Sequence, residues 1–121
     1  MTHPFQPHLD AAVAAAGRAG DFLRERFLQP HIVDEALAHD IKLRLDKETQ
    51  QLITAELSQR FPDISVLGEE GNSGPEQAES RWIIDPIDGT VNYFYGLPIF
   101  CVCIALEHRG RLVLGCVVDP M

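Results

Sequence analysis

The fold expected for this chain is decided at residues 82–90, which read Trp82-Ile83-Ile84-Asp85-Pro86-Ile87-Asp88-Gly89-Thr90. The apolar start predicts a buried strand, and that strand ends on a carboxylate, Asp85. Pro86 restricts φ and bends the chain, so that Asp85 and Asp88 can face one pocket. This order of residues indicates a ligand site at the end of a central strand.

Two neighbouring carboxylates repel each other, and divalent cations offer the simplest relief. Mg²⁺ favours a few carboxylates together with water and phosphate oxygens. Gly89 lets the backbone approach a ligand, and Thr90 supplies a hydroxyl where a helix through Val91 and Asn92 can begin. This segment therefore predicts Mg²⁺ and a phosphate group in one pocket.

A second acidic segment, Gly68-Glu69-Glu70, closes another predicted strand and can add a third acid to the same metals. Each piece has an ordinary alternative. Asp-Gly and Asp-Pro are common turn dipeptides, glutamate pairs usually lie on solvated faces, and Asp46 can be no more than a helix N-cap. Only their combination along one chain favours a metal site.

Helices and strands flank this centre on both sides, which indicates an α/β fold. A helix is predicted for residues 9–28, because apolar residues recur at helical spacing until Pro30 ends the pattern. A second helix opens after Leu45, with Asp46 as its candidate N-cap, and stops at Phe61-Pro62. The predicted strands are 40–45, 64–67, 81–85 and a hairpin of 100–107 with 112–118, and 72–80 is a polar loop.

The composition is that of one compact globular domain, with 121 residues of which 45% are hydrophobic. The formal charge of −8 disfavours nucleic acid and anionic membranes as partners. No apolar run approaches the roughly 18 to 20 residues that cross a bilayer, and the N-terminus lacks a basic segment, so we expect a cytoplasmic protein. Cys101, Cys103 and Cys116 cannot all pair, and we expect buried free thiols.

Three segments in this order, 68–70, 82–93 and 98–106, resemble the inositol monophosphatase family of magnesium-dependent, lithium-sensitive sugar-phosphate phosphatases. The resemblance runs from about Leu9 to the end of the chain. It implies a layered α-β-α-β-α sandwich, of which residues 1–121 are the N-terminal, metal-binding part with its helices and sheet. We expect the natural sequence to continue past Met121, because the chain stops directly after an apolar strand that nothing covers. The family also carries a later Trp-Asp segment with a further metal ligand, which is absent here.

The same resemblance implies a two-metal site. Glu69 and Asp85 correspond to ligands of the first metal, together with the carbonyl of Ile87, and Asp85 also bridges to a second metal bound by Asp88. Two such cations about 4 Å apart would stabilise the attacking and leaving oxygens of a displacement at phosphorus. We therefore expect Mg²⁺ as the cofactor.

The resemblance also implies which residues assist the water and the phosphate. Thr90, with Glu69, corresponds to the hydroxyl that orients and deprotonates the attacking water, and Asp46 pairs with that threonine. Asp88, Gly89 and Thr90 are expected to contact the phosphate, the last two through backbone N–H groups. Such chemistry needs no covalent enzyme intermediate.

Two other acidic motifs fit less well. Haloacid dehalogenase phosphatases also carry Asp-Gly-Thr, but their nucleophilic acid stands two positions before the second aspartate, where this chain has Pro86. A calcium-binding loop would need an acid at Ile84, and Asp85 and Asp88 are three positions apart. Both alternatives are therefore disfavoured.

The leading hypothesis is a phosphomonoesterase that hydrolyses inositol monophosphate or a related small sugar or polyol phosphate. Relatives that act on fructose 1,6-bisphosphate, histidinol phosphate or phosphoadenosine phosphate have similar motifs, so the substrate stays open. The alternative is a catalytically incompetent fragment that binds metal weakly or self-associates. We expect the isolated 121 residues to be largely inactive, and homodimers are usual in the family.

Overall fold

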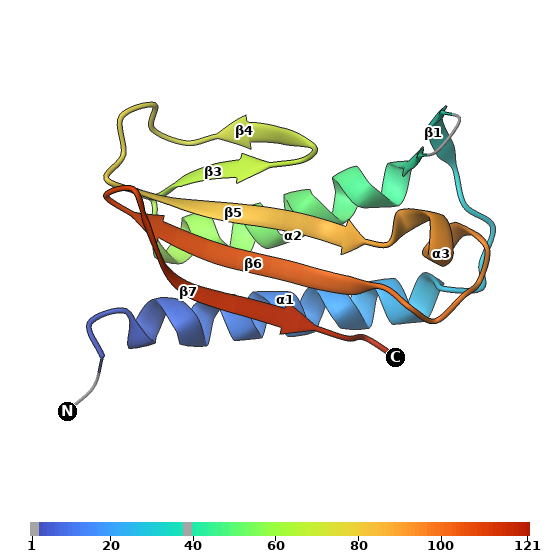
Figure 1. Cartoon of the computed structure of the whole chain (residues 1–121), viewed down its shortest axis with the longest axis horizontal. Coiled ribbons are helices and arrows are strands. Elements are labelled where there is room, and N and C mark those ends of the chain that lie inside the picture. The colour runs from blue at the N-terminus through green and yellow to red at the C-terminus, as the bar shows by residue number, and fades with distance from the viewer. Residues whose placement is uncertain (1–2, 38–39) are drawn as a thin grey trace.

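The computed structural model describes residues 3–37 and 40–121, and in this part of the chain two long helices cover one face of a mixed β-sheet (Figure 1). The helices are α1 (Gln6–Arg26) and α2 (Arg44–Arg60). The sheet has the strand order β4-β3-β5-β6-β7. Its strands are β3 (Ser65–Gly68), β4 (Gly71–Ser73), β5 (Ser80–Asp88), β6 (Cys101–His108) and β7 (Arg111–Val118).

Three short elements complete the fold near the start of α2 and the end of β5. β1 (Val33–Ala36) and β2 (Ile41–Leu43) pair antiparallel in a two-stranded ribbon that leads into α2. α3 (Thr90–Phe94) follows β5 after a single residue, Gly89. Among the described residues, no helix combines the length and the apolar character needed to cross a membrane.

The core lies between the helices and the sheet, and alternation along the strands fills it. On β6, Val102 and Ile104 are buried in this core, whereas Cys101 and Cys103 are only partly buried on the opposite face. That alternation is the two-residue period expected of a strand with one covered face. Cys116 on β7 is also half-buried, so the prediction of free thiols is confirmed and that of buried ones is wrong.

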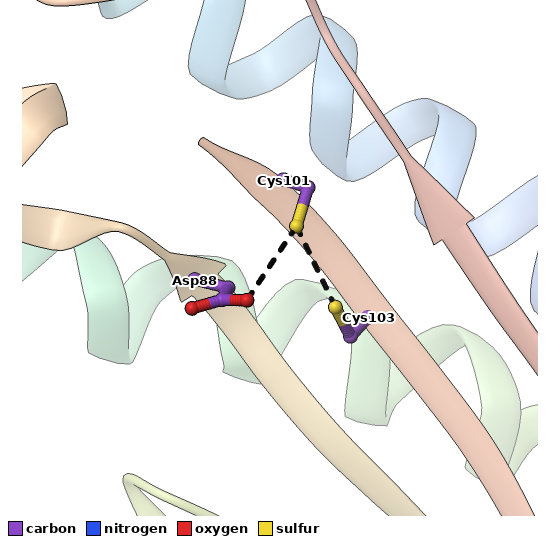
Figure 2. Close-up of side chains that lie close together, drawn as sticks. All are labelled: Asp88, Cys101 and Cys103. Carbon is purple, nitrogen blue, oxygen red and sulfur yellow. Dashed lines mark hydrogen bonds between the residues drawn. The ribbon is translucent and has the colours of Figure 1, made fainter. Parts of the chain in front are cut away.

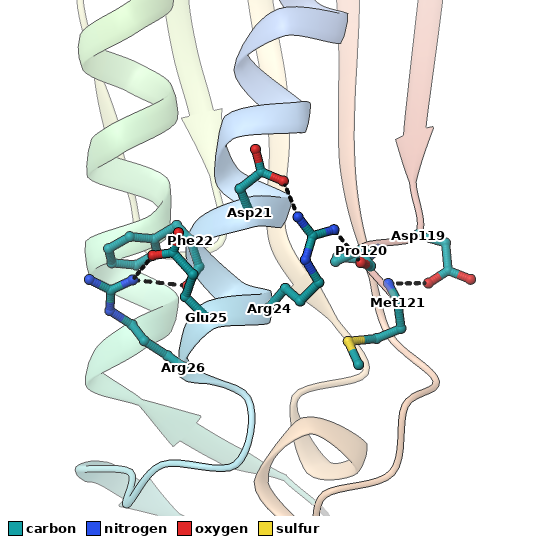
Figure 3. Close-up of polar contacts among 8 residues, drawn as sticks. All are labelled: Asp21, Phe22, Arg24, Glu25, Arg26, Asp119, Pro120 and Met121. Carbon is teal, nitrogen blue, oxygen red and sulfur yellow. Dashed lines mark hydrogen bonds and ion pairs between the residues drawn. The ribbon is translucent and has the colours of Figure 1, made fainter.

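α1 approaches the sheet closely because its buried face consists of small residues. They are Ala11, Ala12, Ala15, Ala16, Ala19 and Gly20. A Cβ at Gly20 would lie 3.4 Å from Cγ1 of Val118 in β7. One turn later, the Arg24 guanidinium donates a hydrogen bond to the Pro120 carbonyl at 3.0 Å and pairs with Asp21 at 2.6 Å (Figure 3). The residues that follow β7 are thus held against the first helix.

One pair of neighbouring strands, β3 and β5, is parallel, with Gly68 opposite Ile84. The other neighbours in the sheet are antiparallel. Parallel strands end at the same edge of a sheet, so the carboxyl ends of β3 and β5 lie together. Glu69 comes directly after Gly68, and Asp85 comes directly after Ile84. The topology therefore brings these two acids to one place.

The structure confirms the two long helices, the hairpin of β6 and β7, and a helix after Gly89, and it corrects the N-terminus of α2. Asp46 is not the N-cap, because α2 begins at Arg44 and Leu43 occupies the cap position. Asp46 lies in the first turn, where its Oδ2 accepts the backbone N–H of Leu43 at 2.8 Å. The helix starts earlier than predicted because this carboxylate reaches back to the chain before it.

Two further predictions are corrected in the strands. β5 does not end in a turn at Pro86 but runs on to Asp88, with a register shift against β6 between Asp85 and Asp88. β4 lies partly in the segment 72–80 that was predicted as a loop, and it exists because β3 offers it an antiparallel partner. Neither correction moves the acids away from the edge of the sheet.

Candidate active site

A cleft of about 300 Å³ lies at the edge where β3 and β5 end. Six of the seven residues predicted for the site line this cleft, together with three neighbours. The lining residues are Asp40, Glu69, Asp85, Ile87, Asp88, Gly89, Thr90, Val91 and Asn92. Asp46, the seventh, lies behind the cleft wall and reaches it through Thr90. The predicted site residues therefore form one group in space.

Asp85 lies in the cleft close to two other carboxylates, Glu69 and Asp88. Its Oδ1 is buried and has no hydrogen-bond partner among the described residues. Burial, followed by the charges of Glu69 and Asp88, raises the pKa of Asp85 to about 7. A buried carboxylate oxygen that lacks a donor and faces other acids is completed well by a divalent cation. The site is therefore suited to a metal ion.

A β-bulge places Asp88 on the same face of the sheet as Asp85. Asp85 pairs with Cys103, and regular pairing would then set Ile87 opposite Cys101. The observed partner of Cys101 is Asp88, so β5 holds one extra residue at this point. A bulge of this kind re-aims the following side chain. It turns two acids that are three positions apart toward one cleft.

Thr90 and Asp46 form a hydrogen-bonded pair at the back of the cleft. Thr90 Oγ1 lies 3.0 Å from Asp46 Oδ1 and 3.1 Å from the Ile87 carbonyl oxygen, so its single proton can be donated to either. Asp46 is 3% exposed, and this burial raises its pKa to about 6, against the lowering effect of its bonds to Leu43 and Thr90. The hydroxyl oxygen of Thr90 keeps free lone pairs that can accept a hydrogen bond from a ligand.

Gly89 has a conformation that a larger residue would not adopt easily. Its φ is 100°, and a Cβ at this position would lie 2.9 Å from the carbonyl oxygen of Ile99. Glycine therefore allows β5 to turn sharply into α3 beside the chain that precedes β6. The turn brings Asp88 and Thr90 to the same cleft.

The sequence analysis missed one residue that positions Glu69. Gln50 on α2 is 7% exposed, and both ends of its amide bind the turn between β3 and β4. Its Oε1 accepts the N–H of Glu70 at 2.9 Å, and its Nε2 donates to the carbonyl of Gly71 at 2.9 Å. Gln50 stands four residues after Asp46, so both polar side chains lie on one face of α2. That spacing was the available signal.

A pair of thiols on β6 lies beside Asp88, a contact that the sequence did not predict. Cys101 Sγ donates a hydrogen bond to Asp88 Oδ2 at 3.8 Å and lies 3.6 Å from Cys103 Sγ (Figure 2). Burial, then the neighbouring Cys103 and Asp88, raises the pKa of Cys101 to about 12. Burial also raises the pKa of Cys103. Both thiols are therefore protonated in the metal-free chain at neutral pH.

Comparison with known proteins gives a consistent result. The model of the inositol monophosphatase family matches residues 5–121. The chain is 36% identical to the Nus factor SuhB of Pseudomonas aeruginosa over 121 residues, which cover 96% of this chain and 45% of that protein. It is 37% identical to the inositol-1-monophosphatase of Mesorhizobium japonicum over 115 residues, which cover 93% and 43%.

A solved structure shows that the likeness extends to the fold. The crystal structure of the extragenic suppressor protein suhB from Bartonella henselae superposes with a TM-score of 0.89 and 33% identity, over 95% of this chain and 46% of that one. The chain therefore spans less than half the length of the relatives that it matches.

Proposed function

Because the chain belongs to the inositol monophosphatase family, we propose that residues 1–121 form the N-terminal, metal-binding part of a Mg²⁺-dependent phosphomonoesterase. The observation that carries this proposal is the Asp85 carboxylate. Its buried Oδ1 has no partner among the described residues, and Glu69 and Asp88 lie close enough to raise its pKa. A cation is the group that best completes such a site.

The cleft offers oxygen ligands for two cations. Glu69, Asp85 and the carbonyl of Ile87 would hold the first, and Asp85 and Asp88 would hold the second. Oxygen ligands of this kind suit Mg²⁺ better than a soft metal. When bound, the cations would acidify a water molecule and offset the charge of a phosphate.

Thr90 and Glu69 have the chemistry to orient that water. Thr90 donates its proton to Asp46 or to the Ile87 carbonyl, so its oxygen can accept a hydrogen bond from the water. Glu69 is exposed at the mouth of the cleft, where its carboxylate can take up a proton. Asp46 acts as a positioning residue, because it holds Thr90 and does not itself line the cleft.

The phosphate would lie over Asp88, Gly89 and Thr90, with backbone N–H groups of the last two as donors. No lysine or arginine is among the residues that line this cleft in the described part of the chain. A dianionic phosphate next to several carboxylates therefore depends on the cations for its binding. This dependence supports a binding order in which the metal ions bind first and the phosphate binds second.

For the substrate, we propose inositol monophosphate or a related small sugar or polyol phosphate. The relatives are about twice as long as this chain. We therefore assign substrate hydrolysis to the whole protein and not to residues 1–121 alone. For residues 1–121 alone we propose metal binding with little or no hydrolysis. Fructose 1,6-bisphosphate, histidinol phosphate and phosphoadenosine phosphate are the alternative substrates to assay beside inositol 1-phosphate.

The metal site can be tested on residues 1–121 by titration calorimetry with Mg²⁺. We expect Asp85→Asn to weaken binding by about tenfold or more, which corresponds to about 1.4 kcal/mol. Asp10→Asn, an exposed change of the same chemical kind on α1, should leave the affinity unchanged. Equal Mg²⁺ affinity in the wild type and Asp85→Asn would overturn the site assignment.

Turnover is tested on the whole protein with inositol 1-phosphate. Phosphate release should require Mg²⁺ and should be lost in Asp85→Asn, because both cations would lose a ligand. Near-normal release by that variant, or release in the presence of a strong chelator, would contradict the proposed chemistry.

A further inference from the structure

Cys101 and Cys103 contribute two sulfur atoms beside Asp88, and the proposed Mg²⁺ chemistry uses neither of them. One ligand atom from each of the three residues lies within 4.8 Å of the other two (Figure 2). We propose that Asp88, Cys101 and Cys103 form a binding site for a thiophilic divalent cation of the Zn²⁺ type, and that this site shares Asp88 with the Mg²⁺ site.

The backbone explains why these three side chains meet. Cys101 and Cys103 are two residues apart on β6, so both project from the same face of the strand. The bulge in β5 places Asp88 directly opposite Cys101, where regular pairing would have placed Ile87. The cluster is therefore built by two paired strands of the central sheet and not by a loose surface loop.

The spacing of the donor atoms fits tetrahedral zinc. Zn–S bonds of about 2.3 Å and a Zn–O bond of about 2.1 Å at tetrahedral angles require sulfur atoms about 3.8 Å apart and sulfur to oxygen about 3.6 Å. The two sulfur atoms lie 3.6 Å apart, and Cys101 Sγ lies 3.8 Å from Asp88 Oδ2. The remaining distance, between Cys103 Sγ and the Asp88 carboxylate oxygen, is at most 4.8 Å. A small rotation of one side chain would shorten it to the value that zinc requires.

The donor atoms also determine which cation the site prefers. Thiolates favour Zn²⁺ and similar soft or borderline cations, whereas Mg²⁺ prefers oxygen ligands. On binding, each thiol releases its proton to the solvent and its sulfur bonds to the cation, with no change of oxidation state. Water can fill the fourth position, as it does in zinc sites with three protein ligands.

Sharing Asp88 gives the site a consequence that rests on the proposed function. A cation held by Asp88 and the two sulfur atoms withdraws that carboxylate from the second Mg²⁺ position. Zn²⁺ should then inhibit the whole enzyme in competition with Mg²⁺, and the inhibition should be relieved by substituting the cysteines.

The site is tested on residues 1–121 by titrating Co²⁺, a spectroscopic substitute for Zn²⁺, under reducing conditions without thiol reagents. Cobalt bound to thiolate has a near-ultraviolet charge-transfer band that oxygen and nitrogen ligands do not produce. We expect this band in the wild type, its loss on adding Zn²⁺, and its persistence in excess Mg²⁺. This readout does not depend on phosphatase activity, so it separates the cysteine site from the proposed function.

Matched variants assign the band to its ligands. Cys101→Ser and Cys103→Ser should each weaken Co²⁺ binding by about tenfold or more, which corresponds to about 1.4 kcal/mol. Cys116→Ser removes the third half-buried thiol, on β7, and should leave the band unchanged. A wild type that binds Co²⁺ without the band, or a band that survives in the Cys101→Ser, Cys103→Ser double variant, would overturn the proposal.

Discussion

Asp85 is half-buried close to two other carboxylates, Glu69 and Asp88, and its protonation links metal binding to the stability of the fold. In the unfolded chain the group titrates near its ordinary value of 3.8, and in the folded chain the pKa is about 7. The folded state therefore holds this proton more tightly. That contribution to stability is fully present below the unfolded pKa and is lost as the pH rises through about 7.

We predict that the metal-free wild type loses stability relative to Asp85→Asn between about pH 5 and about pH 8, because Asp85 acquires its charge in the folded state. At the higher pH, Mg²⁺ should stabilise the wild type more than Asp85→Asn, because only the wild type has a carboxylate at position 85 to bind the cation. Urea denaturation at both pH values, with and without Mg²⁺, measures the two differences. A stability difference that is the same at both pH values would refute the role of this charge.

Gly68 is a position where one added carbon atom should disturb the site from a distance. A Cβ there would collide with the side-chain amide of Gln50, which holds the turn that carries Glu69. We predict that Gly68→Ala lowers the free energy of unfolding by about 1–3 kcal/mol and also weakens Mg²⁺ binding.

Gly17→Ala is the control for this substitution. Gly17 lies within α1, and nothing lies within 4 Å of an added Cβ, so the change should stabilise the protein by about 0.5–1 kcal/mol through helix propensity. Thermal denaturation compares the two variants, and calorimetry measures Mg²⁺ binding. Normal binding by Gly68→Ala would show that Gln50 does not position Glu69.

At the scale of the element, α1 depends on the small size of its buried side chains. Ala16 is 0% exposed and belongs to the face that packs in the core. We predict that Ala16→Leu lowers the free energy of unfolding by about 1–3 kcal/mol, because the helix must move outward to accept the larger side chain. Urea denaturation should show this loss, whereas Val13→Leu at a half-exposed position should stay within about 0.5 kcal/mol of the wild type.

The sequence predicted the elements whose residues carry their own periodic pattern. α1, α2 and the hairpin of β6 and β7 have such patterns, and each was found within a few residues of its true ends. β4 could not be predicted, because its residues Gly71–Ser73 are polar and exposed and become a strand only through pairing with β3. The bulge in β5 could not be predicted for the same reason, because a bulge is defined only by the pairing with its partner strand, here β6.

The candidate site was predictable in its acids and less so in the residues that support them. Asp85 and Asp88 stand within one short motif, and the structure places both on the lining of one cleft, as that motif predicted. Asp46 was predicted as a partner of Thr90, and the hydrogen bond between the two is present at 3.0 Å. Gln50 was missed, because a glutamine within an amphipathic helix looks like an ordinary wet-face residue until the turn that it binds is placed beside it.

At the scale of the whole molecule, the sheet separates two kinds of surface. One face is covered by α1 and α2, and its core includes Trp82 and Ile84. The opposite face carries an apolar recess of about 470 Å³, whose lining includes Ile83, Ala105 and Val117. Glu69 and Asp85 also line this recess, so the acidic cleft and the apolar face adjoin.

The contact between α1 and the end of β7 has a consequence for biosynthesis. The hydrogen bond from Arg24 to Pro120 joins residues 96 positions apart. At about 5–20 residues per second, the ribosome makes the second partner roughly 5 to 20 s after the first. During that interval the face of α1 that will meet β7 is without its partner. An alanine face offers little apolar area to other nascent chains. The small side chains of α1 therefore also limit its association with other chains before β7 has been synthesised.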